Sequence, residues 1–122
     1  MDEKRWARAA VVFAGGALGT GLRVALLDLL GHEVLGLALI NLTGAFLLGV
    51  VSGAYANRIT MVRLFLAVGG LASFTSWSTL TLQSMGPDGV LVAALETAAG
   101  VGLAGLGHLA ARTLKLRRRG RR

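Results

Sequence analysis

The chain alternates between long apolar runs and short polar connections. The four runs cover residues 9–30, 34–55, 61–85 and 90–111. Each run reaches or exceeds the roughly 20 residues that a helix needs to cross about 30 Å of hydrocarbon. No segment shows the strict alternation of apolar and polar residues that is typical of a half-buried strand. The pattern therefore predicts an all-α integral membrane protein, in which residues 1–122 form one domain of four transmembrane helices with antiparallel neighbours.

The third run differs from the others because its middle is polar. Gly69 and Gly70 are followed by hydroxyl side chains, which are Ser73, Thr75, Ser76, Ser78, Thr79 and Thr81. A helix that only anchors the chain in lipid has no need of them. Non-helical backbone at membrane depth is tolerated only where it is buried in protein or lines a cavity. We therefore expect the third helix to be broken near its middle and to serve a function.

The composition agrees with closely packed membrane helices. Hydrophobic residues make up 54% of the chain, charged residues make up 16%, and the mean hydropathy is +0.66. The 18 glycines and single proline suit transmembrane helices, in which small residues let two backbones approach. The absence of cysteine excludes disulfides and thiolate metal sites.

The basic residues predict the orientation of the chain. Four spans place both termini and the connection between the second and third spans on one side, and all lysines and arginines except Arg23 belong to that side. The positive-inside rule makes it the cytoplasmic side of the plasma or inner membrane. The basic tail, residues 112–122, then acts as an orientation signal that also contacts anionic lipid. Nucleic-acid binding is the weaker interpretation of the net charge of +7, because no binding motif accompanies it.

Two motifs of small and polar residues lie in the first and second runs. Gly15 and Gly19 have the spacing that permits close helix contact, so we interpret them as packing positions. Arg23 is expected to reach the membrane surface or to pair with Asp28, in preference to contacting a ligand. Asn41 is costly in mid-membrane without partners, so it either bridges helices or lines a pore, and it shares a helix face with Gly44 and Ala45.

The third motif contains two aromatic residues on one helix face. Phe74 and Trp77 lie three positions apart among the hydroxyl side chains. Aromatic residues at this spacing usually serve packing. Here they suggest a polar pathway walled by rings, because the edge of an aromatic ring is electropositive and can face an anion.

Together, the three motifs resemble those of the CrcB/Fluc family of small four-span fluoride channels. The family has a glycine-rich first helix with an arginine, an Asn-x-x-Gly-x-Phe-x-x-Gly pattern in the second helix, and a glycine-rich stretch before Phe-Thr-Thr-Phe-Ser-Thr in the third. The matching positions are Gly15, Gly16, Gly19, Arg23, Asn41, Gly44, Phe46, Gly49, Gly69, Phe74, Thr75, Ser78 and Thr79.

The resemblance implies passive export of fluoride through an antiparallel dimer with two narrow pores. By analogy, Asn41 donates a hydrogen bond to fluoride, the ring edges of Phe74 and Trp77 contact it, and hydroxyl side chains line the pathway; these are Thr75, Ser78 and Thr79. The backbone carbonyls of Gly69 and Ala72 correspond to those that hold a structural sodium ion at the centre of the dimer interface.

Three departures from the family pattern concern the same region. Trp77 replaces a phenylalanine, Ala72 and Ser73 replace two glycines, and Glu96 in the fourth run aligns with a serine. A carboxylate near mid-membrane costs about 2.5–3.5 kcal/mol on insertion scales and opposes an anion if it is ionised. Glu96 is therefore protonated, paired with a cation such as Arg23, or part of a pore that does not conduct.

The charge bias also predicts a single fixed topology. An antiparallel partner is then a different chain of opposite bias, and an identical copy is the alternative. Two other functions compete with the channel: a proton-coupled, four-span transporter of the multidrug type that uses Glu96, and a non-conducting structural subunit. We do not expect an enzyme, because His32 lies in a connection and His108 near a helix end, neither with a buried acidic partner at ligand spacing.

Overall fold

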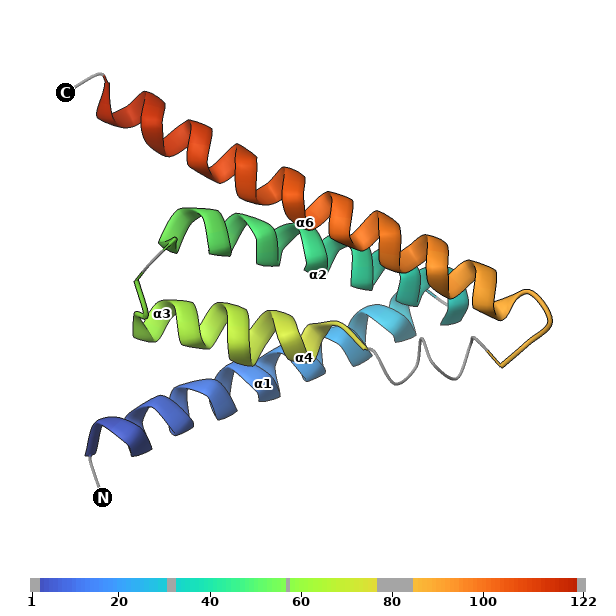
Figure 1. Ribbon diagram of the computed structural model, residues 1–122. Coiled ribbons are helices and arrows are strands. Elements are labelled where there is room, and N and C mark those ends of the chain that lie inside the picture. Colours follow the sequence, from blue (N-terminus) through green and yellow to red (C-terminus); the bar gives the residue numbers. More distant parts are fainter. Residues whose placement is uncertain (1–2, 31–32, 57, 77–84, 121–122) are drawn as a thin grey trace.

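The computed structural model describes residues 3–30, 33–56, 58–76 and 85–120, without the side chains of residues 33 and 34. Three long helices dominate it: α1 (Glu3–Leu30), α2 (Glu33–Tyr55) and α6 (Gly89–Arg119). Between α2 and α6, three short helical segments follow one another without interruption (Figure 1). They are α3 (Met61–Arg63), the π-helix η1 (Leu64–Leu71) and α4 (Ala72–Phe74).

The long helices contain the first, second and fourth predicted runs. All three are long and apolar enough to cross a membrane. The fourth is longer than expected, because α6 continues through the basic tail as far as Arg119. Leucine, lysine and arginine favour helix, and no glycine or proline interrupts them before Gly120.

The third run forms a shorter helix that stops early, so the predicted break is confirmed. The helix ends at Phe74, and Thr75 adopts an extended conformation with φ −78° and ψ 152°. Gly69 and Gly70 do not form this break, because both lie within η1. Instead, the helix ends where the hydroxyl-bearing side chains begin, and these residues compete for backbone hydrogen bonds in non-helical conformations.

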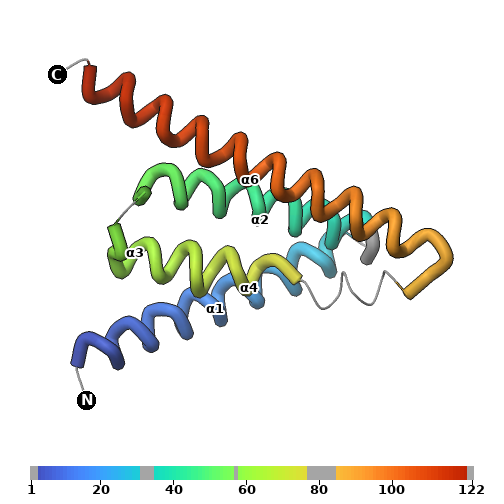
Figure 2. Tube along the Cα trace, in the orientation of Figure 1, coloured from blue at the N-terminus to red at the C-terminus, as the bar shows by residue number. Residues whose placement is uncertain are grey.

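The helices associate as two pairs. α2 packs along α6, and α1 packs along η1 and α4, whereas direct contact between α1 and α2 is much smaller. Figure 2 shows the two pairs diverging toward the end that carries both termini and the α2–α3 connection. The polar break after α4 lies toward the other end, where the pairs are closer together.

Glycines allow both pairs to pack backbone against backbone. A Cβ atom on Gly19 of α1 would collide with the carbonyl oxygen of Gly70, and one on Gly15 would collide with that of Phe65. On the other pair, a Cβ atom at Gly107 of α6 would collide with the carbonyl oxygen of Phe46. These contacts agree with the packing role expected of Gly15 and Gly19.

Replacing Gly107 with alanine is expected to lower the free energy of unfolding by about 1–3 kcal/mol, since the added methyl group overpacks the α2–α6 interface. Gly105→Ala on the same helix is a matched control, because a Cβ atom there meets nothing within 4 Å. The control should be neutral or gain up to about 1 kcal/mol from helix propensity. Unfolding midpoints in mixed micelles measure both effects, and equal shifts in the two variants would contradict this account of the interface.

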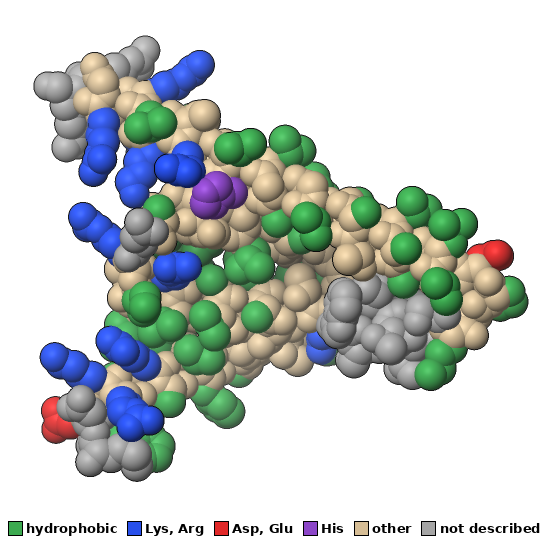
Figure 3. Space-filling view, in the orientation of Figure 1, with side chains coloured by type: hydrophobic (Ala, Val, Ile, Leu, Met, Phe, Trp, Pro, Cys, Tyr) green, Lys and Arg blue, Asp and Glu red, His purple; other side chains and the backbone are tan. Residues whose placement is uncertain are grey.

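The chain exposes more surface than a compact soluble monomer of its mass, and many of the exposed side chains are large and apolar. The accessible surface is 8643 Å², whereas compact soluble monomers of this mass have roughly 6,200 Å². Phe13 is 79% exposed and Leu29 is 81% exposed, and apolar side chains cover much of the face seen in Figure 3. Such a surface requires lipid or another subunit as its neighbour.

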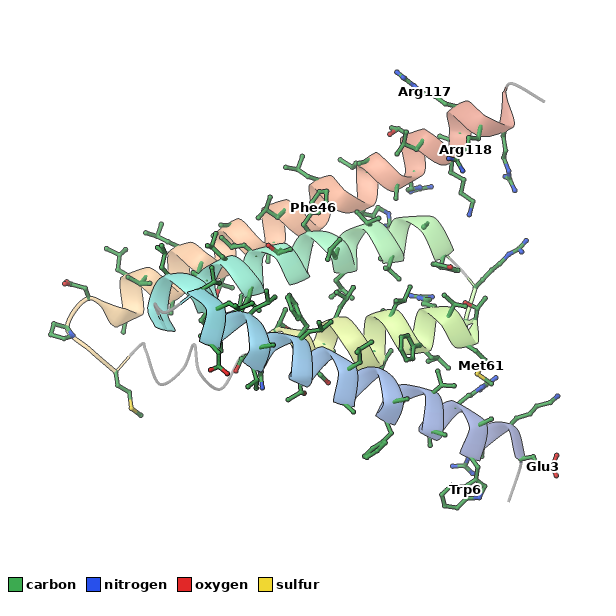
Figure 4. The ribbon with its side chains drawn as sticks, turned by 180° about the vertical axis from the view of Figure 1, so that it is seen from behind. Glu3, Trp6, Phe46, Met61, Arg117 and Arg118 are labelled. Carbon is green, nitrogen blue, oxygen red and sulfur yellow. The ribbon has the colours of Figure 1, made fainter. Side chains whose placement is uncertain are left out.

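Basic side chains collect at the end that carries the termini, as Figure 3 shows. Arg117 and Arg118 stand on the projecting end of α6, and Trp6 points outward near the start of α1 (Figure 4). The Lys115 ammonium donates a 2.8 Å hydrogen bond to the carbonyl oxygen of Ala54. It thereby satisfies one of the free carbonyls at the end of α2 and holds α6 against it.

Candidate functional site

The site is built around the point where α4 ends. The Arg23 guanidinium, which comes from α1, donates a 3.3 Å hydrogen bond to the carbonyl oxygen of Thr75. The Thr75 hydroxyl donates to the carbonyl oxygen of Ala72 at 3.2 Å. Both bonds occupy carbonyls that the end of the helix leaves without intrahelical partners. Within the described residues Arg23 forms no ion pair with Asp28, so its observed role is to anchor the break.

Asn41 connects three segments of the chain. Its Oδ1 atom accepts a 2.8 Å hydrogen bond from the backbone N–H of Ser76, just after the break. Its Nδ2 atom donates at 2.9 Å to Oε1 of Glu96 on α6. A backbone N–H can only donate, so the bond to Ser76 fixes which end of the amide faces which neighbour. Asn41 therefore bridges helices, as one of the two sequence interpretations proposed.

Glu96 is half-buried and only partly satisfied. Its Oε1 atom accepts from Asn41, but its Oε2 atom is buried and finds no hydrogen-bond partner within residues 3–30, 33–56, 58–76 and 85–120. In the part of the chain that the structure describes, no cationic side chain forms an ion pair with it. The predicted pairing with a cation such as Arg23 is therefore not made within one chain, where Arg23 binds the Thr75 carbonyl instead.

A cavity of about 290 Å³ opens between α2, α6 and the break. Its other walls are apolar or small residues of α2 and α6, so the polar groups are concentrated in one part of it. Those polar residues are Asn41, Thr75, Ser76, Glu96 and Thr97. The cavity also agrees with the predicted face of α2, since Ala45 lines it together with Asn41.

The structure brings together some of the predicted pathway residues and separates others. Asn41 and Thr75 line the cavity, but Phe74 does not; its ring packs against Gly44, where a Cβ atom would lie 3.2 Å from the Phe74 Cδ1 atom. Trp77, Ser78 and Thr79 lie outside the described residues, so their predicted role on the pathway stays a prediction.

Sequence reasoning did not assign Ser76 and Thr97 to the site. Ser76 is only 5% exposed, and its backbone N–H, which is what contacts Asn41, gives no signal in a sequence. Thr97 follows Glu96 directly, and its hydroxyl donates to the Ala93 carbonyl at 2.7 Å.

The two carbonyls predicted to hold sodium lie in different surroundings. Ala72 is exposed, and its carbonyl oxygen accepts from the Thr75 hydroxyl. Gly69 is buried against α1, where a Cβ atom would lie 2.5 Å from the Val12 carbonyl oxygen, and its own carbonyl accepts from the Ala72 N–H. Each carbonyl oxygen keeps a second lone pair that could bind a cation. Of the two residues, only Ala72 is exposed.

Comparison with known proteins places this arrangement in a family. Residues 10–111 match the family described as "CrcB-like protein, Camphor Resistance (CrcB)". The chain belongs to the CrcB family. With its apolar helices, this membership makes it an all-helical, multi-pass membrane protein of the plasma or inner membrane.

Several CrcB relatives are named as fluoride channels. "Fluoride-specific ion channel FluC 1" of Nitrobacter hamburgensis is 36% identical over 88 residues, covering 66% of this chain and 70% of the relative. FluC of Methylobacterium nodulans is 38% identical over 73 residues, covering 57% of this chain and 59% of the relative. FluC of Cereibacter sphaeroides is 33% identical over 105 residues, covering 78% and 85%. No solved structure shows a significant match.

Proposed function

We propose that this chain is a subunit of a fluoride-selective channel that lets fluoride leave the cytoplasm by passive permeation. The observation that carries the proposal is the Asn41 amide, which is fixed by Ser76 and Glu96 at the wall of a cavity next to a broken helix. The names of the FluC relatives supply the identity of the ion. They give no support to a multidrug-type transporter, which we keep as the alternative.

Fluoride holds its water strongly, so a selective pathway has to replace that water with hydrogen-bond donors. The Asn41 amide carries two N–H groups, of which one is bonded to Glu96. Among the described residues the other has no partner, which leaves it for an anion in the cavity. We propose that the ring edges of Phe74 and Trp77, and the hydroxyls of Ser78 and Thr79, continue the pathway beyond this donor.

We further propose that the conducting form contains a second subunit in antiparallel arrangement. The large exposed apolar surface supports a subunit interface. The basic residues gathered at the end that carries the termini support a single topology with cytoplasmic termini (Figure 3). A partner of opposite charge bias would then insert the other way, whereas an identical copy would require this chain to insert in both directions.

A structural sodium ion at the centre of that interface is part of the same proposal. Oxygen ligands suit a hard cation, and the Ala72 carbonyl lies on an exposed residue that a second subunit could share. The buried position of Gly69 against α1 gives its carbonyl less support as a ligand. The positive charge would favour an anion nearby, while Asn41 orients that anion.

The test is fluoride efflux from liposomes that contain the purified chain, followed with a fluoride electrode. We expect efflux that spares chloride, either from the chain alone or only after a CrcB subunit of opposite charge bias is added. The first result supports a homomeric channel with both insertion directions, and the second supports a heteromeric one. Absence of fluoride efflux in both preparations would contradict the channel and favour the transporter or the structural subunit.

A further inference from the structure

The Glu96 carboxyl is held at one oxygen and unsatisfied at the other. Oε1 accepts from Asn41 Nδ2 at 2.9 Å, while Oε2 is buried and has no hydrogen-bond partner among the described residues. The bond from the Ser76 N–H to Asn41 Oδ1 fixes the amide, so Asn41 can only donate toward Glu96. Oε1 is therefore an acceptor, and any proton on the carboxyl sits on Oε2.

Within the part of the chain that the structure describes, no charged group of the neighbouring elements forms an ion pair with Glu96. On α2, the titratable residues Glu33 and Tyr55 lie at the two ends of the helix. Residues 64–84, which follow α3 through the break, contain no titratable side chain. Asp88, the N-cap of α6, lies eight residues before Glu96, and His108 lies twelve residues beyond it. These separations are about 12 Å and 18 Å along the helix axis. Arg23 of α1 reaches the break, but its guanidinium donates to the Thr75 carbonyl.

The two protonation states therefore differ sharply in cost. An ionised carboxylate would leave a charged, acceptor-only oxygen buried without a donor, which is among the most expensive arrangements in a protein interior. The neutral acid leaves a single O–H without a partner and carries no charge. It also removes the negative charge from a cavity that an anion has to enter.

We propose that Glu96 is a proton-binding site within the membrane, and that fluoride passes the cavity only while this proton is bound. The inference rests on the fluoride pathway proposed above. Loss of the proton breaks the O–H bond at Oε2, transfers the proton to a water molecule and leaves the electron pair on the carboxylate. The carboxylate then binds the Asn41 N–H more strongly and repels fluoride from the donor that it needs.

Fluoride efflux from liposomes at equal internal and external pH tests the coupling. We expect the wild-type rate, corrected for protein-free liposomes, to fall as the pH rises, because the carboxylate repels fluoride from the cavity. Glu96→Gln keeps an oxygen that accepts from Asn41 and cannot ionise, so its efflux should not vary with pH. Glu3→Gln is the matched control, because Glu3 is exposed at the start of α1 and its variant should keep the wild-type profile.

Infrared spectroscopy of the reconstituted protein tests proton binding without relying on transport. The C=O stretch of a protonated carboxylic acid should be present in the wild type, disappear as the pH rises, and be missing from Glu96→Gln but not from Glu3→Gln. This band without fluoride efflux at any pH would support the proton site and contradict the proposed channel. A missing band, or wild-type efflux that does not change with pH, would overturn the inference.

Discussion

Replacing Asn41 with aspartate is expected to reduce the initial rate of fluoride efflux by about ten- to hundredfold. Aspartate keeps an oxygen that can accept the Ser76 N–H, so the helix break should remain in place. It replaces the Nδ2 donor with a second oxygen, which faces Glu96 and cannot bond to an anion. A hydrogen bond to a charged group contributes about 1.5–3 kcal/mol, and losing it lowers the rate by about ten- to hundredfold.

Thr43→Ala is the control for this experiment. Thr43 lies on the same helix two residues away, but it is exposed and does not line the cavity. Its variant should conduct at the wild-type rate. An Asn41→Asp variant that conducts as fast as the Thr43→Ala variant would show that the amide is not the donor on the fluoride pathway.

Ser76→Pro is expected to reduce efflux by up to about tenfold through a change in the backbone alone. Proline has no N–H, so the Asn41 oxygen loses the donor that fixes the amide. The backbone before the new proline can accommodate it, because Thr75 is already in the extended conformation that a residue preceding proline prefers. The freed amide can then rotate and present its oxygen to the cavity, where it repels an anion.

Ser76→Ala separates the backbone from the side chain at the same position. Alanine removes the hydroxyl and any bond that the hydroxyl makes, but it keeps the N–H that holds Asn41. Its efflux, measured in the same liposomes, should stay closer to the wild type than that of Ser76→Pro. Equal losses in the two variants would mean that the hydroxyl, and not the backbone donor, is what the site needs.

The long helices were predictable because burying a backbone in lipid requires a continuous apolar helix, and hydropathy reports this directly. The need of Asn41 for partners was predictable for the same reason, since an unpaired amide is costly there. The partners of Asn41 could not be predicted. One of them is the backbone N–H of Ser76, and every residue except proline has such a group, so the sequence does not single it out. The approach of Glu96 depends on how α6 lies against α2, which glycines such as Gly49 and Gly107 permit but do not specify.

The residue at which the third helix breaks could not be predicted from the sequence pattern either. Glycine tolerates irregular backbone better than any other residue, so the sequence made Gly69 and Gly70 candidates for the break. The structure uses them instead to bring η1 against α1, because their missing side chains allow backbone contact. Arg23 then binds the Thr75 carbonyl in place of Asp28, since an exposed helix end offers a carbonyl without an intrahelical partner.

The π-helix η1 determines which change of chain length the site tolerates. In η1 the N–H of Ala72 reaches back five residues to the carbonyl of Ala67, one residue further than in an α-helix. Deleting one residue from an α-helix rotates everything after it by about 100°. Deleting one residue from η1 would instead remove the extra residue of the π-helical turn and let the segment relax to an α-helix, so Thr75 and Ser76 would stay closer to their present direction. An in-frame deletion of one codon within residues 64–68 should therefore harm the site less than the same deletion in an α-helical segment.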